Sequence, residues 1–389
     1  MHLITTSEAL RTLVTRAVAT GLAAVDTEFV SHNSYYPKLA LIQVALDSED
    51  VAVIDPLVIR DLTPLGMLLG HDDVVKVLHA PETDLALLHD TTGTVPCNIF
   101  DTQCAASLVG LPKQVSLAGL VAALLNEVLN KSETVTAWLR RPLRPKQLAY
   151  ACDDVRYLCQ AYKVLQGRLA RLGREAWLAE EMQGYSDRAL YTPADVRTAY
   201  LRFRRLNRLT GKQRAAIQAV AAWREAKARQ LDTPRRWLLP DGAVKAIAIR
   251  LPRNLRHLGR IRDLPDGFVG RYGQELLLEV QSVRALSPED YPPEPPSLPS
   301  DDAFTARAAS AAAFVRERAE NRHVAPQRVA SLKEVKAHVA GFHSPLRSGW
   351  RYEFVGRDLD RLLKSGDDLV TSTDPPRPQH SPAVFPGQH

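Results

Sequence analysis

The sequence predicts an α/β domain with a mixed sheet, followed by two small all-helical domains, and three observations support this prediction. Short runs rich in Val, Ile and Leu, which are typical of buried strands, all lie before residue 80. Helical patterns separate and follow these runs, as they do in layered α/β domains. Beyond about residue 195 the strand signals nearly vanish, while the helical patterns continue.

The first predicted domain covers residues 1–195. Its strands are predicted at 22–29, 39–46, 51–54 and 74–79. Because the turn-forming pair Asp47-Ser48 separates the second and third strands, these two should form a hairpin. Its helices are predicted at 7–20, 63–70, 82–90, 101–109, 115–128 and 145–172.

The rest of the chain is predicted to contain two helical domains, at 200–290 and 300–368, and a tail. The helices are predicted at 197–230 (one or two), 242–285 (several short ones), 302–320, 332–340 and 356–364. The proline-dense stretch 287–300 is typical of a linker between the two domains. Residues 369–389 are polar and rich in proline, which predicts a disordered tail.

Charge is divided unevenly along the chain. Residues 1–190 contain 17 Lys and Arg against 22 Asp and Glu, whereas the remaining residues contain 33 against 22. An acidic half can hold divalent metal ions through carboxylates, and a basic half can neutralise phosphates. A merely solvated basic surface would give the same counts, so the charge favours a polyanionic partner without deciding the question.

Several classes of protein are excluded by what the sequence lacks. No apolar run approaches the ~18 residues that span a bilayer, and residues 1–6 do not resemble a signal peptide. The four cysteines show no CxxC pairing, so we expect buried free thiols in a cytoplasmic protein. Gly211-Lys212 lacks the upstream glycine and the following Ser or Thr of a P-loop, so no use of ATP is expected.

Two carboxylates, Asp26 and Glu28, interrupt the first apolar strand. Their spacing of two places both side chains on one face of the strand. Neighbouring carboxylates repel each other and lose hydration when they are buried, and a divalent cation between them removes the repulsion. A half-exposed strand with an acidic outer face explains the pair equally well. The pair alone therefore leaves metal binding open.

Three further polar residues follow later in the chain. Asp84 lies in the first turn of a predicted helix, where a carboxylate is also favoured by the helix dipole. Tyr150 and Asp154 are four residues apart, which places a phenol and a carboxylate on one helical face. An exposed stripe on an amphipathic helix would show the same spacing, so each signal is weak by itself.

Together, the order and spacing of these residues resemble the DEDD family of 3′–5′ exonucleases, in the subclass with a tyrosine in its last motif. The resemblance is closest to the ribonuclease D group and covers roughly residues 20–165. Its motifs are Asp26-Thr27-Glu28-Phe29, Asp84 after His79-Ala80, and Tyr150 with Asp154. Its supporting segments are Tyr35-Tyr36-Pro37-Lys38-Leu39, Leu41-Ile42-Gln43, Asp101-Thr102-Gln103, Lys131-Ser132-Glu133 and Trp138-Leu139-Arg140-Arg141-Pro142-Leu143.

The resemblance implies a ribonuclease H-like fold and hydrolysis that uses two metal ions ~4 Å apart. It implies that Asp26 bridges both ions, that Glu28 and Asp154 complete one site, and that Asp84 helps to hold the other. Tyr150 would orient the attacking water. Mg²⁺ suits such oxygen ligands and Mn²⁺ could replace it. The products would be 5′-mononucleotides.

The resemblance also implies a set of substrate-binding residues, and the chain departs from the family at two points. The implied residues are Thr27, Phe29, His79, Gln103 and Lys131. Ser31-His32-Asn33 stands where an arginine is frequent, which puts part of the grip on the 3′-terminal nucleotides in doubt. Asn130 stands where an aspartate is common. Neither departure involves an implied metal ligand.

The basic half contains a stretch suited to nucleic acid. Residues 197–236 include twelve Lys or Arg against two acidic residues, with interleaved aromatic residues. We expect Trp223 and Trp237 to be core residues, with the arginines divided between solvent and ligand. Residues 207–286 resemble an HRDC domain, through Trp223-Arg224, Pro234, Ala246-Ile247-Ala248, Leu251-Pro252 and Arg271-Tyr272-Gly273. Residues 302–368 resemble a second such module, which ends in Gly349-Trp350-Arg351 and Gly356.

The function implied is a 3′–5′ exoribonuclease that trims tRNA precursors and other structured RNAs, most simply as a monomer. A DNA 3′–5′ exonuclease is an alternative, because the metal chemistry does not depend on the sugar. Contacts to the 2′-OH would discriminate between the two. A catalytically silent RNA-binding scaffold is a second alternative, and the presence of all five motif residues argues against it.

Overall fold

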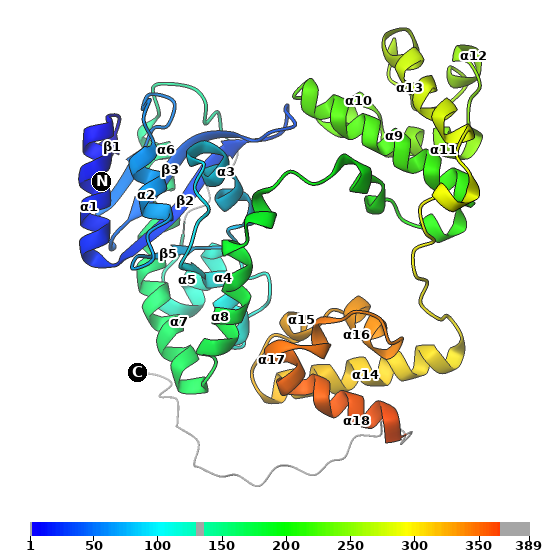
Figure 1. Cartoon of the computed structure of the whole chain (residues 1–389). Coiled ribbons are helices and arrows are strands. Elements are labelled where there is room, and N and C mark those ends of the chain that lie inside the picture. The colour runs from blue at the N-terminus through cyan, green and yellow to red at the C-terminus, as the bar shows by residue number, and fades with distance from the viewer. Residues whose placement is uncertain (1, 130–135, 366–389) are drawn as a thin grey trace. The chain divides into compact units, whose positions relative to one another are not determined.

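The computed structural model describes residues 2–129 and 136–365. They form two compact units, of which the first ends at residue 297 and the second begins at residue 298. Figure 1 shows a sheet surrounded by helices in the N-terminal part of the first unit, and only helices from α9 onward. None of the described helices is long and apolar enough to cross a bilayer.

A six-stranded mixed sheet forms the centre of the first unit, which confirms the predicted fold class. The strands are β1 (His2–Ile4), β2 (Leu22–Val30), β3 (Lys38–Ala45), β4 (Val51–Ile54), β5 (Val75–Leu78) and β6 (Ile99–Asp101). Their order in the sheet is β1-β4-β3-β2-β5-β6. Strand β3 pairs antiparallel with β2 and with β4, so the predicted hairpin is confirmed, whereas β1–β4, β2–β5 and β5–β6 pair in parallel.

The helices around the sheet follow most of the predicted ranges. They are α1 (Ser7–Thr20), α2 (Thr63–Leu69), α3 (Glu82–Thr92), α4 (Thr102–Leu108), α5 (Leu117–Leu125), α6 (Pro145–Arg156), α7 (Leu158–Leu172) and α8 (Glu175–Gln183). The prediction of one helix over 145–172 was wrong, because the chain breaks at Tyr157 between α6 and α7. Strands β1 and β6 were not predicted, because they have three residues each and are too short to show a strand period.

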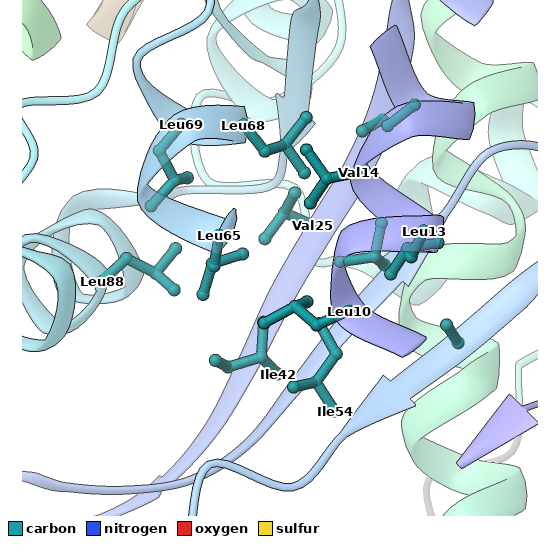
Figure 2. Packing of buried hydrophobic residues seen from close by; sticks show 14 of the residues in the cluster. Leu10, Leu13, Val14, Val25, Ile42, Ile54, Leu65, Leu68, Leu69 and Leu88 are labelled. Carbon is teal, nitrogen blue, oxygen red and sulfur yellow. The ribbon is translucent and has the colours of Figure 1, made fainter. Parts of the chain in front are cut away.

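The faces of the sheet place apolar and acidic residues on opposite sides. Val25, Ile42 and Ile54 pack against leucines of α1 and α2 in one buried cluster (Figure 2). Because successive side chains of a strand alternate between faces, Asp26 and Gln43 point to the other face of the sheet. Helix α6 packs against β2, β3 and β4. The apolar cluster therefore fixes which face of β2 carries the acidic residues.

A buried ion pair fixes the segment that leads into α6. The side chain of Arg141 donates two hydrogen bonds to Asp55, from Nε to Oδ2 at 2.5 Å and from Nη2 to Oδ1 at 2.8 Å. Nη2 also donates to the carbonyl oxygen of Ala40 on β3, at 2.9 Å. Since Asp55 directly follows β4, this two-pronged contact ties the start of α6 to the middle of the sheet.

The rest of the first unit is helical. Its 3₁₀ helices are η1 (Gly184–Ser186), η2 (Arg188–Tyr191), η3 (Val196–Arg202), η4 (Leu206–Arg208) and η5 (Pro288–Asp290). Its α-helices are α9 (Gly211–Gln230), α10 (Arg235–Leu238), α11 (Asp241–Arg250), α12 (Leu255–Leu258) and α13 (Phe268–Arg284). Trp223 is buried in their core, as predicted. The prediction that Trp237 is a core residue was wrong: its side chain is 60% exposed, since the short helix α10 turns it outward.

A loop of the α/β domain contacts this helical region directly. The loop joins β2 to β3, and the hydroxyl of its Tyr35 donates a hydrogen bond to Glu225 on α9. The backbone N–H groups of Tyr35 and Tyr36 both donate to Oδ1 of Asp232, at 3.1 and 3.0 Å. Lys38 forms an ion pair with the same aspartate, at 3.6 Å. The loop that leaves the acidic strand is therefore held by α9 and the residues after it.

The second unit is a small helical domain. Its helices are α14 (Asp302–Asn321), α15 (Pro326–Val329), α16 (Leu332–Val339), the 3₁₀ helix η6 (Pro345–Arg347), α17 (Gly349–Arg351), the π-helix η7 (Tyr352–Gly356) and α18 (Arg357–Ser365). A Cβ atom at Gly356 would lie 1.9 Å from the carbonyl oxygen of Leu346, so the backbones there can approach only because this residue is glycine. The predicted tail at 369–389 lies outside the described residues.

We expect Arg141→Ala to lower the free energy of unfolding by about 3 kcal/mol, because it leaves the charge of Asp55 buried without a partner. The Asp55 side chain is only 4% exposed. Chemical denaturation measures the change, and Arg140→Ala, which removes the preceding exposed arginine, is the control. Equal stability of the two variants would show that the pair does not hold this segment.

Candidate active site

The residues predicted as catalytic lie on three elements that meet on one side of the sheet. Asp26 and Glu28 lie on the central strand β2. Asp84 lies in the first turn of α3, and Tyr150 and Asp154 lie one turn apart on α6. The carboxylate of Asp26 interacts electrostatically with those of Glu28, Asp84 and Asp154. The fold thus brings together four acidic side chains that span 129 positions of the chain.

Burial raises the pKa of all four carboxyl groups, and repulsion from other carboxylates of the group adds to this effect at Asp26 and Glu28. Burial raises the pKa of Glu28 to about 8, with further repulsion from Asp154 and Asp84. Burial likewise raises the pKa of Asp154 to about 7 and that of Asp84 to about 6. The pKa of Asp26 rises well above its ordinary value, first through burial and then through Asp84 and the other two carboxylates.

The protein itself offers little compensation for these charges. No lysine or arginine within residues 2–129 or 136–365 forms an ion pair with any of the four carboxylates. The hydroxyl of Thr27 donates a hydrogen bond to Oδ1 of Asp84, and Tyr150 donates one to Asp154. A donor set made only of oxygen atoms, with excess negative charge, fits Mg²⁺ or Mn²⁺.

The four acidic side chains are close to one another, but they are not arranged as the ligands of one metal ion. Among the described residues, no three acidic, histidine or cysteine side chains come together closely enough to hold one ion. The hydrogen bonds that Asp84 and Asp154 accept turn these carboxylates toward hydroxyl groups of the protein. The four carboxylates therefore lie close enough to interact, but they do not converge on one point.

A buried aspartate sets the position of Asp84. Oδ1 of Asp101 accepts hydrogen bonds from the backbone N–H groups of Ala80, at 3.0 Å, and Gln103, at 2.8 Å. Ala80 has a φ angle of 54°, which is uncommon for a residue with a Cβ atom. Because Ala80 lies just before α3, the contact with Asp101 holds the sharp turn that starts this helix.

Two of the predicted substrate-binding residues, His79 and Gln103, are already hydrogen-bonded within the protein. Both ring nitrogens of His79 are hydrogen-bonded, Nδ1 to the Thr102 hydroxyl at 2.9 Å and Nε2 to the Val115 carbonyl at 3.0 Å. Burial lowers the pKa of His79, so its ring is neutral. Nε2 of Gln103 donates to the same Val115 carbonyl, at 3.0 Å.

Three further residues, Thr27, Phe29 and Lys131, are predicted to bind substrate, and the structure describes the first two. Thr27 is buried, with its hydroxyl on Asp84, and Phe29 is partly exposed at the far end of β2. Lys131 lies outside the described residues. The substrate contacts of all five residues stay predictions.

Gln43 is a residue of the site that was not predicted as one. Gln43 pairs with Asp26 across β2 and β3, so the two side chains lie on the same face, with Cβ atoms about 5 Å apart. It is fully buried, and neither Nε2 nor Oε1 has a hydrogen-bond partner among the described residues. A glutamine inside the otherwise apolar run LALIQVAL was the available signal.

Comparison with known families defines the class of this protein. The family described as 3′–5′ exonuclease matches residues 1–170, and the family described as HRDC domain matches residues 213–280. The first match spans β2, α3 and α6, the elements that carry the acidic side chains. The chain is therefore a 3′–5′ exonuclease domain joined to an HRDC domain.

Individual relatives narrow this class. Ribonuclease D of Sphingobium indicum is 37% identical over 93% of this chain and 94% of its own length, and that of Zymomonas mobilis is 34% identical over 93% and 94%. The crystal structure of Escherichia coli RNase D matches with a TM-score of 0.85 and 28% identity, over 94% of this chain and 99% of that one. The chain belongs to the ribonuclease D family, which confirms the predicted 3′–5′ exoribonuclease activity.

We expect the metal-free protein to lose stability as the pH rises from 4.5 to about 8. In this window the folded state keeps a proton on Glu28 that the unfolded chain has released, so the folded state binds more protons and its stability falls with rising pH. Urea denaturation in a chelator at several pH values measures the slope. Glu28→Gln should make the slope shallower, whereas Glu49→Gln, in the exposed β3–β4 turn, should leave it unchanged.

We expect Gln43→Leu to reduce nuclease activity without reducing stability. Removing a buried amide that has no partner should leave the free energy of unfolding unchanged or raise it by about 1 kcal/mol. The loss of a polar neighbour beside Asp26 should lower the reaction rate. Denaturation and initial rates, measured on the same preparation, separate the two effects, and full activity would exclude a role for Gln43 at the site.

Proposed function

We propose that the chain trims the 3′ ends of structured RNAs, including tRNA precursors, by hydrolysis supported by two Mg²⁺ ions. The observation that carries this proposal is the group of four buried carboxylates, Asp26, Glu28, Asp84 and Asp154, which have raised pKa values and no compensating cation among the described residues. Membership of the ribonuclease D family supports an RNA substrate. The four cysteines of the chain are all free, which suits a reducing compartment such as the cytoplasm.

The four carboxylates would hold the two ions of this proposal. Asp26 is central, because it interacts with each of the other three, and it would bridge both ions. Glu28 and Asp154 interact with each other and would complete one site, while Asp84 would help to hold the other. Bound Mg²⁺ lowers the pKa of a coordinated water and neutralises charge on the scissile phosphate.

In this proposal Tyr150 would orient the attacking water. Its phenol lies one turn from Asp154 on α6 and donates a hydrogen bond to that carboxylate. With a cation held by Asp154, the phenol would orient a water molecule toward the scissile phosphate. Its ring lies beside that of Trp138, with 6.1 Å between centroids, so the phenol is held on its apolar side. Cleavage in this arrangement would release 5′-mononucleotides.

The choice of structured RNA rests on the relatives and on the helical part of the chain. The Escherichia coli protein is described as an exoribonuclease involved in structured RNA processing. The chain carries an HRDC match and a basic C-terminal half, which suit binding to a folded polyanion.

We expect Asp26→Asn to reduce the rate of nucleotide release by more than ~100-fold. A loss of up to ~100-fold is typical when a residue that only supports a metal ligand is replaced, and Asp26 is predicted to be a ligand itself. The assay uses 5′-labelled tRNA precursor, unstructured RNA and single-stranded DNA with Mg²⁺ or Mn²⁺, and follows product length over time. The control is Asp153→Asn, since Asp153 is half-buried on α6 and pairs with Arg156 at 3.6 Å. Unchanged degradation by Asp26→Asn would refute the site, and preferential degradation of DNA would refute the substrate.

A further inference from the structure

A cavity of about 460 Å³ lies where the β2–β3 loop meets the helical region. Its volume is within the ~300–1,000 Å³ that is typical of small-molecule sites. Its polar and aromatic lining includes Tyr35, Arg202, Arg224, Arg235, Arg236 and Trp237. None of these residues belongs to the acidic site, so the cavity is a separate feature of the molecule.

Positive charge exceeds negative charge around this cavity. Glu225 is buried and forms ion pairs with Arg235 at 2.6 Å, Arg202 at 3.2 Å and Arg229 at 3.6 Å. Asp241 similarly pairs with Arg224 at 2.7 Å and Arg236 at 3.2 Å. Five guanidinium groups thus share two carboxylates. The surplus charge favours an anion at the cavity.

Two of these arginines have nitrogen atoms available to a ligand. Arg236 meets Asp241 through its Nε and its side chain is 81% exposed. Arg202 contacts Glu225 through Nη1 and its side chain is 49% exposed. The planar guanidinium group of either residue can still donate two parallel hydrogen bonds to a phosphate.

The cavity also offers an aromatic face. Trp237 lines it with a side chain that is 60% exposed, next to Arg236 in the sequence. By contrast, the ring of Tyr35 is already covered by Arg235 and Arg229, whose guanidinium carbons lie 5.0 and 5.9 Å from its centroid. An exposed indole beside exposed guanidinium groups is suited to a base attached to a phosphate, since bases stack on aromatic rings.

We propose that this cavity is an RNA-binding subsite. It binds a single nucleotide of the RNA, which lies upstream of the 3′ end. Its base stacks on Trp237 and its phosphate binds Arg236 and Arg202. Ser34 and Tyr35, which also line the cavity, belong to the loop that leaves the strand of Asp26 and Glu28. The cavity therefore adjoins the loop that directly follows the acidic strand. The identity of the ligand rests on the proposed function, because an RNA substrate supplies the nucleotide.

The test measures RNA binding by the full chain in the Asp26→Asn background, by fluorescence anisotropy with labelled single-stranded RNA. Trp237→Ala should weaken binding about tenfold or more, and Trp237→Phe should restore much of it. Arg236→Ala should make the dependence of log affinity on log salt shallower by about 0.7. Arg253→Ala, which removes another exposed arginine of the same domain, should leave binding unchanged. Since Trp237 is largely exposed, thermal denaturation should show that each variant is folded.

The outcomes separate this proposal from the proposed function. If the Asp26→Asn chain binds RNA and Trp237→Ala binds it equally well, the subsite is refuted while the nuclease function stands. If free AMP binds in a Trp237-dependent manner but RNA affinity does not depend on Trp237, the cavity is a mononucleotide site and the proposal is refuted. If the unsubstituted chain neither binds nor degrades RNA, the proposed function itself is refuted.

Discussion

Repulsion among four buried carboxylates is the interaction on which the organisation of the first domain depends. Burial alone disfavours the charged form of each group, and the neighbouring carboxylates add to this effect at Asp26 and Glu28. A fold that only had to be stable would not keep them together. The apolar cluster of Val25, Ile42 and Ile54 on the opposite face of the sheet contributes the stability that offsets this repulsion.

Two polar contacts fix the positions of the site residues that lie on helices α3 and α6. Arg141 ties the entry of α6 to Asp55 at the end of β4, and thereby places Tyr150 and Asp154 above the sheet. Asp101 holds the turn at Ala80 and thereby places Asp84 at the start of α3. Each of these aspartates is almost completely buried and hydrogen-bonded, so loss of either contact leaves a buried charge unpaired. The chemistry of the site therefore depends on residues that do not touch a substrate.

The sequence predicted what local periodicity controls and missed what depends on distant partners. The helix at 7–20 and the strand at 51–54 were predicted with the bounds that the structure has. No glycine or proline lies at the break at Tyr157, so the sequence does not predict it. Strand β1 is defined by its pairing with β4, which is distant in the sequence. Trp237 was wrongly predicted in the core, although Pro234 and Pro240 on either side of α10 are local signals that this helix is short. The acidic site was found through the spacing of its motifs, whereas Gln43 became visible only once its strand partner was known.

Proton release on binding of Mg²⁺ tests the central claim most directly. If the fold holds protonated carboxyl groups together until a cation arrives, binding must displace their protons. Calorimetric titration of Mg²⁺ near neutral pH, in two buffers with different ionisation enthalpies, gives the number of protons released. The account predicts release of about one proton or more per chain, and a loss of this release in Glu28→Gln, whose carboxyl has a pKa of about 8. Binding of Mg²⁺ with no exchange of protons would contradict it.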